Sequence, residues 1–297
     1  TAIGYATLSS QNADGNAWNT AVGASAGAAI TTGTENTLLG GAAADALTIG
    51  VRNTALGYGA LGSDVEGSRS VAVGYAALNA QALSGSGDAV TTNNTAVGYN
   101  AAGDNAVTGK QNTAIGSGAM QELTEGEHNT AVGYLALSAN TDGDKNVAIG
   151  SYAMQNYNET SGASEYNVAV GYNAGNDILE GGFGNICLGG KSGESITVGD
   201  YNVAIGYHAL GDTTTAGKCI AIGTNAGQSI HDASTATDPD GTIAIGYNCA
   251  DALTSGRYNI AIGLDAMGSV ITGTHNTVMG YAALSSANTN ESGNVAI

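Results

Sequence analysis

One motif recurs along the whole chain: Asn, a small or β-branched residue, Ala, Val or Ile, and then Gly. It stands, for example, at Asn94–Gly98, Asn146–Gly150 and Asn259–Gly263. Nine of the fifteen spacings between consecutive motif glycines are 17 residues, and two are 18. A fixed short period predicts coils that stack in one dimension, each contacting only its neighbours. The motif glycines are Gly4, Gly23, Gly40, Gly57, Gly74, Gly98, Gly116, Gly133, Gly150, Gly171, Gly189, Gly206, Gly223, Gly246, Gly263 and Gly280.

Each repeat contains two apolar pieces and a polar turn. In a typical unit Thr130 and Val132 alternate with Ala131 and Gly133, which is the period-2 pattern of a short strand. We expect the β-branched face to point into the coil and the small face to lie against another backbone. A second apolar piece begins three residues after the motif Gly and predicts a second short strand or its entry turn. A Gly in a polar stretch, such as Gly143, supplies the next turn.

The sequence therefore predicts an all-β fold, a parallel β-solenoid or β-roll of about 16 short coils of 17–18 residues. We expect residues 1–297 to form a single continuous repeat array, a segment of a longer fibre. A face of Ala and Gly offers little core, so we expect burial against other copies in a homotrimer intertwined around a common axis. Three longer coils divide the array into super-repeats of four coils at about 19–93, 94–166, 167–241 and 242–297.

The motif Asn has a constant place in the coil and predicts a ladder of stacked side chains. Ser70, Cys219 and Thr242 replace it in three units. The predicted structural ladder comprises Asn53, Asn94, Asn112, Asn129, Asn146, Asn167, Asn202 and Asn259, with Gly98, Gly116, Gly133 and Gly150. The extra residues of the long coils are polar and predict surface-contact loops, because insertions in solenoids often form the binding face. These loops are bounded by Asn79 and Asn93, by Gln155 and Tyr166, and by Gln228 and Gly241.

Composition excludes several classes of partner. The formal net charge is −18, from 25 acidic and 7 basic residues. Such a chain repels nucleic acid and anionic membrane surfaces. No apolar run approaches the length of a membrane span, so we expect no membrane insertion. Three cysteines occupy three different repeat positions, which favours small apolar fillers over a disulfide or a metal site.

The pattern predicts no catalytic site, no enzymatic activity and no cofactor. The four histidines share no register, and neither a nucleophile elbow with partners nor a phosphate loop is present. Acidic turns offer weak candidates for Ca²⁺ at Asp142 and Asp144 and at Asp238 and Asp240, with solvated turns as the simpler interpretation. Tyrosines that directly follow the motif Gly could bind glycans, although packing at coil corners or between subunits is favoured.

The segment Asn129–Leu137 resembles the repeats of long phage tail-fibre proteins. Asn202–Gly206 is also similar to the head repeats of trimeric autotransporter adhesins, whose units read Asn-Ser-Val-Ala-Ile-Gly. The resemblance extends over essentially the full chain, although the 17-residue coil is longer than adhesin-head coils and closer to the fibre type. It implies a left-handed parallel β-roll, three chains around a common axis, and a role in attachment to cell surfaces.

We therefore expect an extracellular structural or adhesive fibre segment, most simply part of a viral tail fibre, whose partners are its own copies and a cell-surface glycan or protein receptor. A bacterial trimeric surface adhesin is the alternative. A glycan-cleaving fibre needs paired acids at one site, and the acids here are scattered. An ice-binding solenoid needs threonines at one register, and Thr31–Thr32, Thr91–Thr92 and Thr213–Thr215 do not form one.

Overall fold

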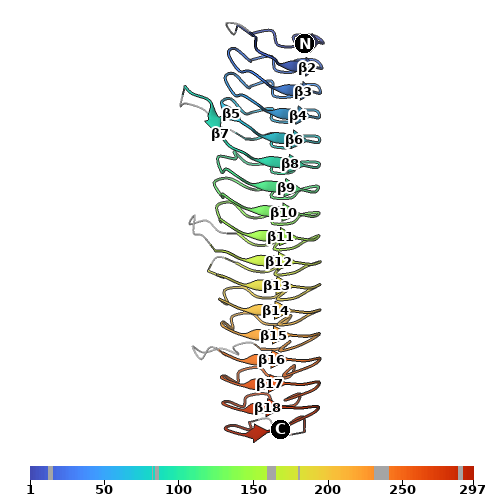
Figure 1. Cartoon of the computed structure of the whole chain (residues 1–297), viewed down its shortest axis with the longest axis vertical. Helices are drawn as coiled ribbons and strands as arrows, with labels where there is room; N and C mark the ends of the chain where they lie inside the picture. The colour runs from blue at the N-terminus through green and yellow to red at the C-terminus, as the bar shows by residue number, and fades with distance from the viewer. Residues whose placement is uncertain are drawn as a thin grey trace. The chain divides into compact units, whose positions relative to one another are not determined.

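The computed structural model describes residues 1–12, 16–81, 83, 87–158, 165–179, 181–230, 241–286 and 290–297. The described residues contain no helix, and the chain winds as a parallel β-solenoid of about 16 turns, which confirms the predicted fold class (Figure 1). The chain divides into two compact units, one formed mainly by Thr1–Lys145 and one that starts at Asn146. The predicted super-repeat boundaries are not tested by this division and stay a prediction.

Each unit is built on one parallel sheet to which every coil contributes one short strand. In the first unit these strands are β1 (Ala2–Ile3), β2 (Thr20–Val22), β3 (Thr37–Leu39), β4 (Thr54–Leu56), β6 (Val71–Val73), β8 (Thr95–Val97), β9 (Thr113–Ile115) and β10 (Thr130–Val132). In the second unit they are β11 (Val147–Ile149), β12 (Val168–Val170), β13 (Ile186–Leu188), β14 (Val203–Ile205), β15 (Ile220–Ile222), β16 (Ile243–Ile245), β17 (Ile260–Ile262), β18 (Thr277–Met279) and β19 (Val295–Ala296). A separate pair, β5 (Gly67–Ser68) and β7 (Val90–Thr91), forms at the first insertion.

The strands are in register along each unit. Ala131 lies opposite Ala114 in the neighbouring coil, and Ala204 lies opposite Ala221. The 17-residue period therefore places equivalent residues directly above one another, about 4.8 Å apart as in any sheet. Each position of the motif becomes a column of side chains.

The predicted orientation of the strand faces is wrong. The central Ala is the buried residue of most strands, and Ala131 and Ala204 are completely inaccessible. The flanking Thr, Val and Ile residues are partly or largely exposed. The reason is the narrow interior of the coil: larger residues from the opposite wall fill most of it, so the residue beneath the strand is usually Ala, with Leu38, Cys187 and Val278 as exceptions.

The second apolar piece is a run of turns, and it supplies the larger core residues. After Gly74, for example, Ala76 and Leu78 adopt left-handed φ values of 52° and 47°. Leu78 is buried, and so are the equivalent residues Leu61, Met120, Leu137, Met154, Leu210 and Met267. A further column, seven residues after the motif Gly, adds Ile30, Leu47, Leu123, Ile178, Ile196, Ile230, Leu253 and Val270.

The backbone N–H groups in the run of turns are hydrogen-bonded, although the run forms no strand. Amides alternate between a carbonyl three residues earlier and a carbonyl of a neighbouring coil. The Ala28 N–H donates to the Ser25 carbonyl (3.1 Å), whereas the Gly27 N–H donates to the Ala43 carbonyl of the next coil (2.9 Å). Both walls of each unit are thus held by hydrogen bonds parallel to the stacking direction.

Candidate functional site

The motif Asn side chains lie inside the coil and join each coil to the next. Asn112 is typical: its Oδ1 accepts from the Asn129 N–H (2.9 Å), and its Nδ2 donates to the Gly126 carbonyl (2.7 Å). The amides therefore connect mainly to backbone groups; direct Nδ2-to-Oδ1 bonds join Asn202 to Asn185 and Asn276 to Asn259. An amide suits this place because it accepts and donates at once. All predicted ladder residues are buried: Asn53, Asn94, Asn112, Asn129, Asn146, Asn167, Asn202 and Asn259.

The motif glycines have a steric role. Gly98, Gly116, Gly133 and Gly150 all have φ between +132° and +144°. At Gly98, Gly116 and Gly150 an added Cβ would clash with the carbonyl of the next motif Gly. The Asn and Gly columns thus form a structural framework, which leaves ligand contacts to other surfaces.

The first insertion is anchored by a buried polar cluster. At the position where seven other coils carry a buried Ile or Leu, two consecutive coils have Asp64 and Gln81. The Asp64 carboxylate accepts from the Gly67 N–H (2.9 Å) and from Gln81 Nε2 (2.6 Å). The hydroxyls of Ser70, which replaces the motif Asn, and Thr92 lie 2.6 Å apart. Burial raises the pKa of Asp64 to about 6, although the hydrogen bonds that its carboxylate accepts from Gln81 and Gly67 oppose the shift.

The ends of the three predicted surface-contact loops lie among the described residues. Asn93 and Tyr166 are exposed, and Gln228 Nε2 donates to the carboxylate of Asp212 (2.8 Å). Gln155 ends a run of turns, and Asn79 and Gly241 lie at coil edges. The central residues of these loops lie largely outside the described part of the chain, so their role in contact stays a prediction.

The Ca²⁺ candidates Asp142 and Asp144 each accept a hydrogen bond from the preceding coil. Asp142 accepts a hydrogen bond from the Thr124 hydroxyl, and Asp144 accepts from the Glu127 N–H (2.7 Å). Both side chains are thus oriented toward the preceding coil. Within the described ranges no group of three or more His, Cys, Asp or Glu side chains is placed to hold a metal. Asp238 and Asp240 lie outside those ranges.

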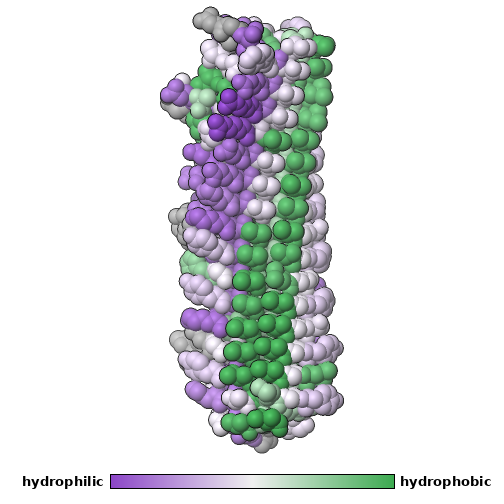
Figure 2. Space-filling model, in the orientation of Figure 1, coloured by the Kyte–Doolittle hydropathy of each residue, from purple (hydrophilic) through white to green (hydrophobic). Residues whose placement is uncertain are grey.

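The outward strand positions form an exposed apolar surface, which we call the strand face. It consists of the first and third residues of each sheet strand (Figure 2). In the second unit both columns are almost entirely Val, Ile or Leu, as in Val203 and Ile205 of β14. In the first unit one column is mainly Thr, at Thr20, Thr37, Thr54, Thr95, Thr113 and Thr130. Sequence reasoning missed this register because it sought threonines outside the motif.

The residue directly after the motif Gly forms an exposed tyrosine column at the end of the strand. Tyr58, Tyr75 and Tyr99 stack on one another with ring centroids 5.7 and 5.4 Å apart. In the second unit Tyr172, Tyr207 and Tyr247 are each more than half exposed. Tyr172 and Tyr207 are separated by one coil, in which Gly190 takes the place of the tyrosine.

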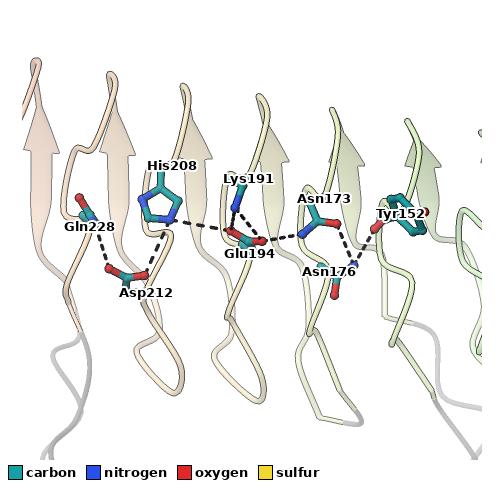
Figure 3. A network of polar contacts seen from close by, with 8 residues as sticks. All are labelled: Tyr152, Asn173, Asn176, Lys191, Glu194, His208, Asp212 and Gln228. Atoms are coloured by element: carbon teal, nitrogen blue, oxygen red, sulfur yellow. Dashed lines mark hydrogen bonds and ion pairs between the residues drawn. The ribbon is translucent and has the colours of Figure 1, made fainter.

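Beside this column in the second unit runs a polar row, composed of the eight residues labelled in Figure 3. Lys191 Nζ donates to both oxygens of Glu194 (3.3 and 3.2 Å). His208 Nε2 lies 3.8 Å from Glu194 and 3.7 Å from Asp212. Asn173 Nδ2 also donates to Glu194 (2.5 Å). Asn173, Lys191 and His208 each stand two residues after a motif Gly, so the repeat pattern alone places them in one column.

The site is an open surface, since the described residues enclose no pocket. No protein-family model and no curated protein matches the sequence. None of the described segments is a helix of the length and apolarity that crosses a membrane. The strand face, the tyrosine column and the polar row are the exposed features on which a partner or ligand could bind.

Proposed function

We propose that this chain is a segment of a homotrimeric attachment fibre, a shaft or head that presents surface to a cell, of the kind found in viral tail fibres. The observation that carries the proposal is the strand face, a continuous apolar surface along each unit. Large exposed apolar patches on soluble proteins mark contact sites. Each Val or Ile that becomes buried contributes about 1.5–3 kcal/mol relative to full exposure.

A second copy of the chain is the occupant that this face fits. The strand face repeats at the interval of a sheet, so an equivalent face matches it coil by coil. The stoichiometry of three comes from the resemblance to fibre and adhesin repeats, in which three chains share an axis. An extracellular location, and the alternative of a bacterial trimeric surface adhesin, belong to the same proposal.

The experiment measures mass and disrupts the strand face. Light scattering of the purified chain should give three times the 29.1 kDa chain mass. Ile205→Glu places a charge on the strand face and should shift the protein toward monomer while the circular dichroism remains that of a β protein. The matched control is Thr215→Glu, at an exposed turn residue off the sheet. A stable wild-type monomer, or equal effects of the two changes, would exclude this assembly.

The column of threonines on the strand face of the first unit supports a second candidate function, the binding of ice. Threonine hydroxyls repeat there at about 4.8 Å from strand to strand, beside a column of Val, Leu and Ile about 6.8 Å away along each strand. Such a regular surface can order water. Thermal hysteresis of the wild type, lost in Thr37→Lys but kept in Ser117→Lys at a coil corner, would support it; freezing identical to that of a buffer control would exclude it.

A further inference from the structure

We propose that the second unit carries an open saccharide-binding slot at Gly190, between Tyr172 and Tyr207, that takes one uncharged pyranose ring of a surface polysaccharide. The inference rests on the proposed attachment function and names its ligand class. Three observations carry it: the interruption of the tyrosine column, the spacing of the two rings, and the polar row beside them.

Gly190 leaves the ring of Tyr207 uncovered on one side. A Cβ at Gly190 would lie 3.6 Å from Cδ2 of Tyr207, and no side chain of another residue is nearer than that ring. Tyr58, Tyr75 and Tyr99 instead occupy consecutive coils and cover one another. Tyr172 is held from its other side by Tyr152, whose ring meets it edge to face at 5.8 Å. Tyr172 and Tyr207 are 55% and 56% exposed.

The spacing suits a single ring. Tyr172 and Tyr207 belong to coils two apart, so their backbones are separated by about 9.6 Å at about 4.8 Å per coil. A flat group in van der Waals contact with both aromatic rings needs about 7–8 Å, at 3.5–4.0 Å per contact. The interval therefore admits one pyranose ring, whose C–H face would lie against one of the two aromatic rings as apolar groups do against tyrosine.

Hydrogen-bonding groups lie beside the slot. Lys191 directly follows Gly190 in the chain, and its Nζ donates to both oxygens of Glu194 (3.3 and 3.2 Å). Glu194 also accepts a hydrogen bond from Asn173 and lies 3.8 Å from His208 Nε2 (Figure 3). Donors and acceptors from three consecutive coils can thus meet the hydroxyls of one sugar, and bonds to charged groups are the stronger ones.

The charge of the slot selects against acidic sugars. Lys191 is its one lysine, while Glu194 and Asp212 are both carboxylates. The whole chain has a net charge of −18. A carboxylated or sulfated saccharide would be repelled on approach. An uncharged hexopyranose meets no such cost.

The test is affinity electrophoresis of the full-length chain in native gels that contain mannan, galactan or dextran, with alginate as the anionic comparison. At least one neutral polysaccharide should retard the wild type. Gly190→Tyr, which fills the slot with the side chain found in neighbouring coils, should weaken that retardation at least tenfold, and so should Tyr207→Ala. Gly41→Tyr is the matched control, because Gly41 also lies beside a tyrosine, Tyr58, but small residues, Ser25, Ala42 and Gly59, stand there at the register of Asn173, Lys191 and His208.

Four results would overturn the slot: no retardation by any of the neutral polymers, equal retardation of the wild type and Gly190→Tyr, equal loss in Gly41→Tyr, or retardation by alginate alone. Light scattering of each variant separates this proposal from the assembly. If the wild type is a monomer and still shows the expected pattern of retardation, the proposed trimer is excluded and the proposed slot is supported. If the wild type is a trimer and no neutral polymer retards it, the proposed slot is excluded and the proposed trimer is supported.

Discussion

At the scale of single residues, two columns with opposite requirements hold the coils together. The motif Asn must have a side chain that donates and accepts inside the coil, because a buried amide or carbonyl without a partner is costly. The motif Gly must have no side chain, because the next coil's carbonyl occupies that space. The two columns are four residues apart in sequence; the Gly repeats in every coil, and the Asn is replaced only at Ser70, Cys219 and Thr242.

The steric requirement predicts a large difference between two glycines of one coil. Gly57→Ala should destabilise the first unit by about 3 kcal/mol or more, since its φ is +138° and a Cβ would clash with the Gly74 carbonyl. Gly59→Ala should cost less than about 1 kcal/mol. Its nearest neighbour would be 3.5 Å away, and Ala76 occupies the equivalent position in the next coil. Urea denaturation of both variants measures the difference; similar midpoints would contradict the steric account.

The ladder predicts that a nearly isosteric change is damaging. Asn112→Asp replaces the Nδ2 donor with an acceptor facing the Gly126 carbonyl and buries a charge. We expect a loss of about 3–5 kcal/mol in unfolding free energy. Asn105→Asp, whose side chain makes an exposed hydrogen bond to the Glu122 carbonyl, is the control and should cost about 1 kcal/mol or less. Equal denaturation midpoints for the two variants would mean that the ladder contributes little.

At the scale of elements, the first and second insertions coincide with polar core residues, whereas the buried Ile230 keeps the core apolar beside the third insertion. The column that begins with Ile30 and Leu47 continues with Asp64 and Gln81, just where β5 and β7 leave the regular coil. In the second unit Tyr157 occupies the same column, and its hydroxyl donates to Glu165 (2.5 Å) across the second insertion. The polar core side chains at these two insertions thus form side-chain hydrogen bonds, Gln81 to Asp64 and Tyr157 to Glu165, which a leucine cannot do.

The burial of Asp64 predicts a pH-dependent stability. Its folded-state pKa of about 6 exceeds the ordinary aspartate value of 3.8, so the folded chain holds the proton more tightly than the unfolded chain. Stability from this group is present below about pH 4 and is lost as the pH rises through 6, by up to about 3 kcal/mol. The unfolding free energy of the wild type relative to Asp64→Asn should therefore fall between pH 4 and pH 7.

Urea titrations at each pH provide the measurement, and Asp88→Asn, an exposed residue, controls for the loss of one negative charge. A constant difference between wild type and Asp64→Asn across this pH range would show that the carboxylate is solvated.

The elements were only partly predictable from sequence. The period gave the coil length, the strand and the parallel stacking, because equivalent residues must align in a solenoid. Alternation shows which residues share a face, but it does not show which face is inside. Here Leu78 and its equivalents come from the run of turns, and they fill the interior that the strand's Val and Ile would need. The left-handed φ values that allow this occur at Ala and Leu residues, which carry no local signal for them.

At the scale of the whole molecule, each unit is a stack in which every coil depends on its neighbours, so stability is a sum of coil and interface terms. The second unit contains three free cysteines, Cys187, Cys219 and Cys249, all buried in different coils. Burial raises the pKa of the Cys187 thiol to about 12, and burial is also the main cause that raises that of Cys249 to about 11.

These thiols predict how the second unit opens. In native buffer at pH 8 iodoacetamide should label all three cysteines at least a hundredfold more slowly than in 6 M urea, because thiolate is scarce and access is closed. Near the urea midpoint the three should become reactive together if the unit unfolds cooperatively. Peptide mass spectrometry reports each site separately. Fast labelling of one cysteine in native buffer would reveal local opening of its coil.

The register of the strands has a consequence for the gene that encodes this chain. One coil corresponds to 17 codons, and the bonds that a coil makes to the coil before it are the same ones that it offers to the coil after it. Unequal recombination between two copies of the repeat would therefore insert or delete whole coils without creating a new kind of junction. Lineages could adjust the length of the array in steps of about 4.8 Å while every intermediate still folds.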